Sequence, residues 1–514
     1  MRISRLLTSA FLLTLTYSAQ ANVTLPALIA DNMVLQQKST VALWGWAEAG
    51  ETVSVTASWQ KAPVNATADA AGNWLVRVPT GQAGGPYTIR FQGRNELTVR
   101  NVLLGEVWLC SGQSNMAFSV SKKPNSGSYT GVINEAEVVP KASYPAIRMF
   151  TVKNTVANEP QRDTQGQWQV CSPQTVGEFS AVAYFFAQEI HEHTRLPIGL
   201  INSTWGGTPA ESWTRKDVLE QDPDFRPILR RYERGLTTFE QDQATYKQQL
   251  AEFQQERAAN PQTARMAPVA PVGVTSNKSP YKLYNGMIRP LIPYTLRGVL
   301  WYQGENNADR AYQYRRLFPA LIQSWRQEWQ QPEMPFYFVQ IAPHRSQNPE
   351  IREAQLLTLQ TVPRTGMAVI TDWGDSLDIH PRNKQVVGHR LAQWALAKDY
   401  GAKKTVYSGP IYHSMKVEAG GQVRLRFDYA AGGLQARNGP LREFTIAGPD
   451  SVFRPAQARI EGNSVVVWNE QVKQPVAVRF AWRAIPNPNF YNAAGLPATP
   501  FRTDQWKLKT QGLL

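Results

Sequence analysis

The chain has 514 residues, which at roughly 100–200 residues per domain corresponds to about two to four domains. Its apolar content of 42% is ordinary for a globular protein. The formal net charge is +14, but lysine and arginine are scattered and form no run of five or more. A solvated basic surface is therefore favoured, and no nucleic-acid partner is expected.

The N-terminus has the pattern of a secretory signal peptide. A basic start, MRISR, precedes the apolar run LLTSAFLLTLTYSAQA, which ends with the small residues Ala19 and Ala21. We expect residues 1–21 to be removed by cleavage after Ala21, leaving a periplasmic or secreted protein. The apolar run is too short for a stable membrane span, and no other segment is apolar enough, so membrane insertion is not expected. In an oxidising compartment Cys110 and Cys171 could pair, and two buried free thiols are the alternative.

Residues 22–103 predict an N-terminal β-sandwich domain. Short alternating segments such as TVALWGW, ETVSVTASW, GNWLVRVP and YTIRFQG are separated by glycine-rich turns. The segment ELTVRNV closes this region as a last strand. The domain of residues 22–103 contains no candidate catalytic cluster, so a packing role for this domain is favoured over contact with carbohydrate.

Residues 104–402 predict an α/β domain, because strands alternate with helices. Ser180 is expected to cap the helix AVAYFFAQEIHEHTR, and the polar stretch that precedes it, up to about residue 165, is expected to form loops. Residues 215–280 are polar and predict a helical insertion, in which YERGLTTFEQDQATYKQQLAEFQQERAA forms one exposed helix. This insertion could form a mobile rim of the site or a dimer contact, and the sequence does not decide between these roles. It does not give the oligomeric state either. Residues 403–514 predict a C-terminal β-rich domain whose last segment returns to the α/β domain.

Four strand ends of the α/β domain carry distinctive polar residues. Because the carboxyl ends of strands in an open α/β sheet gather at one edge, where ligands bind, we expect these residues to meet there. They are Ser114 at the end of GEVWLCSGQSNM, Gly206 and Gly207, the segment 303–306, and Asp378 with His380.

These residue types fit acyl transfer, which needs a nucleophile, a base, an acid that orients the base, and an oxyanion hole. Ser114 is the candidate nucleophile and His380 the candidate base. The backbone N–H groups of Ser114, Gly206 and Gly207, with the Gln303 amide, are the candidate oxyanion donors. The serine lacks the second glycine of G-x-S-x-G, so a nucleophile elbow is not supported. Nothing has metal-ligand spacing or a phosphate-binding glycine loop, so neither a metal nor a cofactor is expected.

The three motifs GQSNM, WYQGENN and DIHPRNK together resemble the sialate O-acetylesterase family, with support from SPQTVGEFSAVAYFFAQE, STWGGTPAESW and LYNGMIRPL. The resemblance spans about residues 22–510. It implies an SGNH-type, flavodoxin-like three-layer α/β/α hydrolase domain flanked by β-sandwich-like units. It also implies Ser114 as nucleophile and His380 as general base, with Glu305 and Asn306 in supporting positions behind them.

The acid of the triad is less clear. Many SGNH enzymes place it three residues before the histidine, where this chain has Leu377. Asp378 is favoured over Asp375, and a Ser–His dyad oriented by a backbone carbonyl is also open.

The sequence thus predicts a secreted serine esterase that removes O-acetyl groups from a carbohydrate, with sialate as the favoured substrate. An acetylxylan or hemicellulose acetylesterase is the alternative on the same scaffold. A non-catalytic carbohydrate-binding protein is the alternative of another class.

Overall fold

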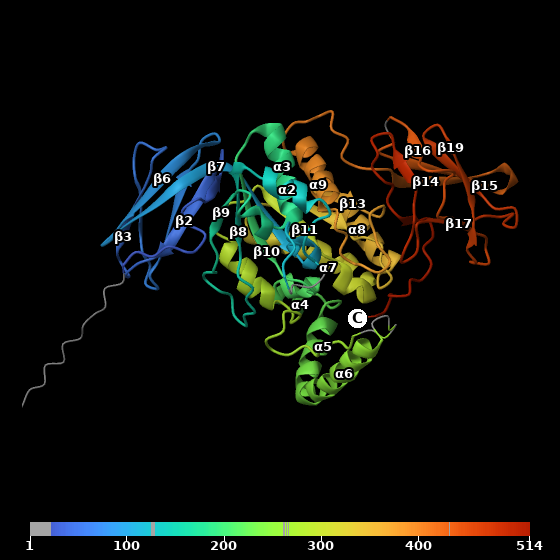
Figure 1. The fold of residues 1–514 in the computed structure, drawn as a ribbon, viewed down its shortest axis with the longest axis horizontal. Helices are drawn as coiled ribbons and strands as arrows, with labels where there is room; N and C mark the ends of the chain where they lie inside the picture. Colours follow the sequence, from blue (N-terminus) through green and yellow to red (C-terminus); the bar gives the residue numbers. More distant parts are fainter. Residues whose placement is uncertain are drawn as a thin grey trace, which may run out of the picture.

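The computed structural model describes residues 22–124, 129–260, 263, 265, 267–430 and 432–513. The predicted signal peptide and its cleavage site at Ala21 lie outside the described residues. Within the described residues, no helix is both long and apolar enough to cross a membrane. Figure 1 shows a mixed α/β structure with a central sheet, β structure toward both ends of the chain, and the helices α5 and α6 projecting from one side.

The longest strand, β7 (Glu96–Gly112), connects the N-terminal β structure to the central sheet. Its first half pairs with β6 (Gly84–Gln92) and β1 (Val34–Gln36), and its second half pairs with strands of the central sheet. The sequence predicted two separate strands here, ELTVRNV and the serine strand. That prediction was wrong, because the chain stays extended and buried from Val102 to Cys110, through Gly105. The predicted domain boundary between residues 103 and 104 falls inside β7.

The central sheet has the order β13-β12-β11-β7-β10-β8-β9. All neighbours are parallel except β8 and β9. The chain builds β8 and β10 on one side of β7 and then crosses to β11 on the other, so the strand order reverses at β7. The bounds are β8 Tyr144–Thr151, β9 Trp168–Cys171, β10 Ile198–Thr204, β11 Gly298–Tyr302, β12 Phe336–Gln340 and β13 Thr365–Val369. Such a reversal is where open α/β sheets place their ligands.

Strand β8 was missed by the sequence, which predicted loops up to about residue 165. Its apolar run is interrupted by Arg148, which reads as a surface residue. The structure buries that guanidinium, which donates to the carbonyl oxygen of Asn101 and, over 3.0 Å, to its Oδ1. Because a buried charge is tolerated when it is hydrogen-bonded, the strand stays inside the sheet. The short helix α2 (Glu135–Lys141) also lies in this predicted loop region.

Two pairs of helices pack beside the sheet. Helix α3 (Ala181–Thr194) lies against α9 (Lys384–Lys398) so closely that a Cβ on Gly388 would be 2.6 Å from the Cβ of Phe185. Helices α7 (Ala311–Glu328) and α8 (Pro349–Thr361) form the other pair (Figure 1). The predicted cap of α3 is confirmed, because the Ser180 side chain accepts a hydrogen bond from the backbone N–H of Ala183.

The helical insertion is built from α4 (Lys216–Gln221), α5 (Arg226–Thr237) and α6 (Phe239–Ala259). The single exposed helix predicted over YERG…RAA was wrong, because the chain breaks at Thr238. The Thr238 hydroxyl donates to Asp242 Oδ2 over 2.6 Å, a local side-chain bond that favours starting a new helix there.

The remaining N-terminal strands are β2 (Thr40–Trp46), which pairs with β5 (Asn73–Pro79), and β3 (Thr52–Ala57), which pairs with β4 (Val64–Thr67) and β6. The C-terminal strands form small antiparallel sheets around their own apolar cluster. Their bounds are β14 Ile411–Glu418, β15 Gln422–Asp428, β16 Leu434–Ala436, β17 Phe444–Ala447, β18 Arg454–Pro455, β19 Gln457–Glu461, β20 Ser464–Trp468, β21 Ala477–Phe480, β22 Phe490–Asn492 and β23 Phe501–Arg502.

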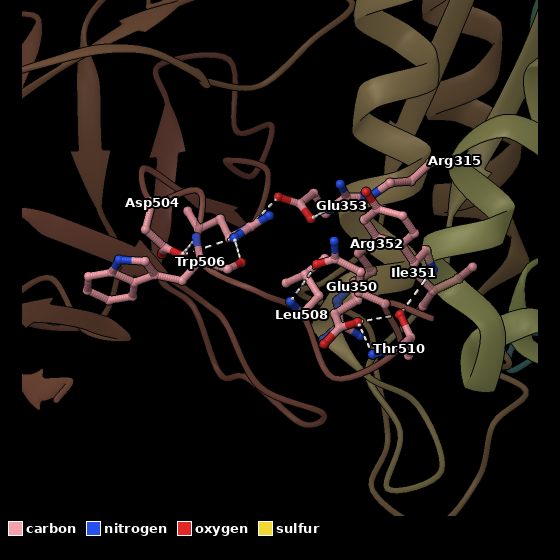
Figure 2. Close-up of polar contacts among 12 residues, drawn as sticks. Arg315, Glu350, Ile351, Arg352, Glu353, Asp504, Trp506, Leu508 and Thr510 are labelled. Carbon is pink, nitrogen blue, oxygen red and sulfur yellow. Dashed lines mark hydrogen bonds and ion pairs between the residues drawn. The ribbon is translucent and has the colours of Figure 1, made fainter. Parts of the chain in front are cut away.

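The C-terminal tail returns to the α/β domain, as the sequence predicted. Figure 2 shows the tail beside α8, with dashed contacts between Thr510 and Glu350. The Glu350 carboxylate accepts hydrogen bonds from the backbone N–H groups of Lys509 and Thr510, over 2.9 and 3.0 Å, and from the Thr510 hydroxyl. Buried Arg352 of α8 donates to the Arg483 carbonyl, so α8 contacts the loop after β21 as well as the tail.

Candidate active site

A cavity of about 950 Å³ opens at the carboxyl end of β7, where the strand order reverses. Ser114, Gly206, Gly207, Glu305, Asn306 and His380 all line it. The structure therefore brings together five of the predicted strand-end positions and the predicted histidine. Gln303, Asp375 and Asp378 lie behind or beside this lining and do not form part of it.

Gly112 is the residue that lets β7 turn into the cavity. It pairs with both Thr204 of β10 and Tyr302 of β11, and its φ of 132° is open to glycine alone. A Cβ at this position would lie 2.2 Å from the Tyr302 carbonyl oxygen. The chain therefore turns sharply after Gly112, and Ser114 starts the short helix α1 (Ser114–Ala117) at the floor of the cavity.

His380 is held against Ser114 by the loop that follows β13. Its Nε2 lies 2.8 Å from Ser114 Oγ, within hydrogen-bond distance. The pKa of His380 is lowered to about 4, first by burial and then by the nearby positive charge of Lys384, while Asp378 opposes both. A neutral imidazole at this distance can accept the serine proton, which is the requirement for a general base.

The two candidate acids differ in what they contact. Asp378 Oδ1 lies 3.5 Å from His380 Nδ1 and accepts the backbone N–H of His380 over 2.9 Å. Asp375 Oδ1 accepts the backbone N–H groups of Leu377 and Asp378, over 2.7 and 3.3 Å. Asp378 thus lies beside the imidazole, whereas Asp375 shapes the turn that carries it.

The turn at Gly206 and Gly207 presents its backbone to the cavity beside Ser114. A Cβ on Gly206 would lie 3.4 Å from the Ser114 Cβ, and Gly207 has a φ of 70°. The carbonyl of Gly206 accepts from Asn277 Nδ2 over 3.1 Å, and that of Gly207 accepts from Asn306 Nδ2 over 2.9 Å. The bond to the Gly206 carbonyl fixes the peptide plane that carries the Gly207 N–H. The plane of the Gly206 N–H carries the Trp205 carbonyl, which accepts from the Thr208 hydroxyl over 2.8 Å.

Gln303 is fully buried and its side-chain amide is engaged. Nε2 donates to Asn307 Oδ1 over 2.7 Å and to the Thr208 carbonyl over 3.3 Å, and Oε1 accepts from the Tyr314 hydroxyl over 3.0 Å. The oxyanion role predicted for Gln303 would require this amide to leave both acceptors.

Glu305 lies behind Ser114, in a position that suits a supporting role. Burial raises the pKa of its carboxyl group, while a hydrogen bond from Asn115 and the charge of Lys384 lower it. Asn115 Nδ2 donates to Glu305 Oε1 over 2.6 Å.

The sequence missed several residues around the cavity. The ring of Tyr129 lies 5.5 Å from that of His380, centroid to centroid. The insertion supplies the outer wall, with Ile228, Arg231, Tyr232 and Lys278 among its lining residues. None of these residues stands in a motif, so only the fold could place them at the site.

Comparison with known proteins agrees with this geometry. The family model described as "Carbohydrate esterase, sialic acid-specific acetylesterase" matches residues 104–266 and 251–397. The chain is 31% identical to the sialate O-acetylesterase of Rattus norvegicus over 92% of this chain and 93% of that one, and 28% identical to that of Homo sapiens over 92% and 91%.

A solved structure titled a novel carbohydrate acetylesterase, from Xanthomonas citri, matches with a TM-score of 0.79 and 36% identity. It covers 94% of this chain and all of its own. These likenesses support an esterase that removes acetyl groups from carbohydrate. The chain therefore belongs to the sialic acid-specific acetylesterase family of carbohydrate esterases.

Proposed function

We propose that this chain is a secreted serine esterase that removes O-acetyl groups from sialic acids through a Ser–His–Asp acyl-enzyme mechanism. The observation that carries this proposal is the 2.8 Å contact between Ser114 Oγ and His380 Nε2 on the wall of a cavity large enough for a sugar. The rat and human relatives, named sialate O-acetylesterases, support the choice of substrate.

The chemistry follows from the contacts. His380 takes the hydroxyl proton as Ser114 Oγ attacks the acetyl carbonyl carbon, and the carbonyl oxygen becomes an oxyanion. The backbone N–H groups of Ser114, Gly206 and Gly207 are the donors we assign to it. The sugar oxygen then leaves with the proton from His380, and a water molecule that His380 deprotonates releases acetate from the serine. Asp378 stabilises the imidazolium that forms in both steps.

Arg231 is the feature of the cavity that supports a carboxylated sugar over neutral xylan. The lining as a whole is mixed in charge, because Arg231, Arg310 and Lys278 line the cavity together with Glu211, Asp309 and Asp242. Arg231 Nη1 is buried and has no hydrogen-bond partner among the described residues. A carboxylate on the substrate could satisfy such a group, whereas an acetylated xylo-oligosaccharide offers no charge.

We also infer the finer architecture that the family likeness implies. The α/β domain, residues 104–402, would be an SGNH-type three-layer α/β/α hydrolase with the insertion 215–280. Residues 22–103 and 403–514 would be flanking β-sandwich-like domains. Cleavage after Ala21 would release the mature protein, and N-terminal sequencing of the exported protein tests that step.

Substitution of Ser114 by alanine tests the mechanism. We expect turnover of an acetyl ester to fall well below a hundredth of wild type, because the acyl-enzyme cannot form. A fluorophosphonate should label wild type and not Ser114→Ala, whereas a non-catalytic sugar-binding protein would label in neither form. Acetate release from acetylated sialic acid, compared with acetylated xylo-oligosaccharide, tests the substrate. Wild-type turnover by Ser114→Ala would overturn the assignment.

A further inference from the structure

A fully buried lysine lies behind the candidate nucleophile, and no step of the proposed mechanism uses it. Lys384 is the first residue of α9 and has no exposed surface. Its Nζ donates to Asn115 Oδ1 over 2.5 Å and lies 4.5 and 5.3 Å from the ring centroids of Phe118 and Tyr302. Within the described part of the chain, no carboxylate oxygen lies within 4.0 Å of it.

A cation at this position destabilises the folded state. A buried charge without a direct ion pair costs several kcal/mol of desolvation, and the first turn of a helix disfavours positive charge. An apolar side chain of the same volume would stabilise the fold better. A cost of this kind beside a candidate active site points to a functional role.

Asn115 joins the lysine to the backbone next to each of the two reacting residues. It follows Ser114 directly, and its Nδ2 donates to Glu305 Oε1 over 2.6 Å and to the carbonyl of Ile379, next to His380, over 3.1 Å. Because an ammonium group only donates, Lys384 forces the Asn115 oxygen toward itself. The NH₂ group must then face Glu305 and the His380 loop, so the lysine sets the orientation of the amide.

The charged groups around Lys384 come from two segments. Glu305 follows β11, and Asp378 and His380 belong to the loop before α9. The pKa of Lys384 is lowered to about 7, because burial outweighs the charges of Glu305 and Asp378, which raise it. The lysine cation in turn lowers the pKa of His380. Below pH 7 the ammonium form predominates, and its charge favours a neutral imidazole.

We propose that Lys384 is a positioning residue that acts through Asn115 to hold the Ser114 turn and the His380 loop together. Its positive charge also keeps the imidazole in the form that accepts the serine proton. The inference rests on the proposed serine-esterase function.

The test compares Lys384→Met with Lys398→Met, its matched control. Lys398 is an exposed lysine at the other end of α9, so the control removes the same charge and the same side chain from the same helix. For Lys384→Met we expect a folded protein, because methionine fills the space without a charge. We expect kcat/KM to fall about 10- to 100-fold, mainly in kcat, since misplacement of reacting groups costs that much.

The acid limb of the kcat/KM profile should also move to higher pH, because the imidazole loses a neighbouring cation. Lys398→Met should match wild type in all three readouts.

A second variant keeps the test decisive if Lys384→Met does not fold. Asn115→Asp preserves the shape and an acceptor for Lys384, but it cannot donate to Ile379 or Glu305. We expect at least a tenfold fall in kcat together with an acid limb at higher pH. Wild-type kcat and acid limb in a folded Lys384→Met, or in Asn115→Asp if the first variant is unfolded, would overturn the inference. Absence of fluorophosphonate labelling in wild type would instead overturn the underlying esterase proposal.

Discussion

The imidazole of His380 lies in surroundings that disfavour its protonation. Its side chain is only 12% exposed, and the cation of Lys384 adds to the effect of burial. Only the neutral ring can take the Ser114 proton, so the pH at which the ring becomes protonated sets the acid limit of catalysis.

We therefore expect the acid limb of kcat/KM to lie near pH 4. An exposed imidazole, with a pKa near its ordinary value of about 6.5, would already be protonated over most of the range from pH 4 to 6.5. Because the pKa of His380 is lowered to about 4, its proton is already lost above that pH and activity persists. Measurement of kcat/KM for a soluble acetyl ester from pH 3.5 to 8 checks this. An acid limb near pH 6.5 would contradict it.

The acid behind the histidine can be identified by a pair of charge-removing variants. Asp378→Asn keeps an oxygen for the His380 backbone N–H but removes the charge 3.5 Å from Nδ1. We expect kcat to fall at least tenfold, because the imidazolium loses its counter-charge. Asp375→Asn is the matched control, since its oxygen can still accept the N–H groups of Leu377 and Asp378. Equal losses in the two variants, measured as kcat at pH 7, would argue against Asp378.

The reacting side chains could be predicted because each stands in a short motif. GQSNM and DIHPRNK give Ser114 and His380 directly, and Gly112 is required by its φ and by the Tyr302 carbonyl. The link between the motifs could not be predicted. Lys384 and Asn115 are both visible in the motifs, but only the fold brings them within 2.5 Å.

Secondary-structure elements were predictable where apolar periodicity was uninterrupted, as in α3, α7 and β10. The errors have local causes. Arg148 interrupts the apolar run of β8, so this strand resembles a loop in the sequence. The buried run through β7 continues without a break, so two predicted strands are one. The insertion carries no motif, so only the folded structure shows that it contributes to the cavity wall.

Arg231 of α5 offers a test of what the insertion does. Its guanidinium lines the cavity and lies 3.7 Å from Glu211, which also binds Arg310 over 3.0 Å. We expect Arg231→Met to raise KM for acetylated sialic acid about tenfold while leaving KM for an uncharged acetyl ester unchanged, because only the former carries a carboxylate. The neighbouring exposed Arg230 does not line the cavity, so Arg230→Met is the control. An equal rise in KM for both esters would assign Arg231 to the shape of the cavity and not to charge recognition.

The molecule as a whole is held together by contacts that the sequence could not predict, because they join residues far apart in the chain. The tail pairs with α8 across about 160 positions, and Arg502 donates to Glu353 Oε1 over 2.7 Å. Figure 2 shows Glu350, Glu353 and Thr510 between the C-terminal β structure and α8. Asn348 directly precedes helix α8 and caps it with its side chain, and the residue before Asn348 is Gln347, which lines the cavity. The tail thus contacts α8, the helix that starts next to the rim of the site.

Glu350→Gln tests how firmly the tail is held. The carboxylate accepts three hydrogen bonds from Lys509 and Thr510, whereas the glutamine amide offers one oxygen and loses the charge. Hydrogen bonds to charged groups contribute about 1.5–3 kcal/mol each. Because glutamine replaces only part of these hydrogen bonds, the free energy of detaching the tail from α8 should fall by about 1–3 kcal/mol. Amide hydrogen exchange at residues 505–513 should therefore become roughly 5- to 150-fold faster, while exchange in β7 stays unchanged. Lys509→Ala is the control, because it removes an exposed side chain and keeps the backbone N–H that Glu350 binds. Unchanged exchange of the tail in Glu350→Gln would show that the carboxylate does not hold the tail on α8.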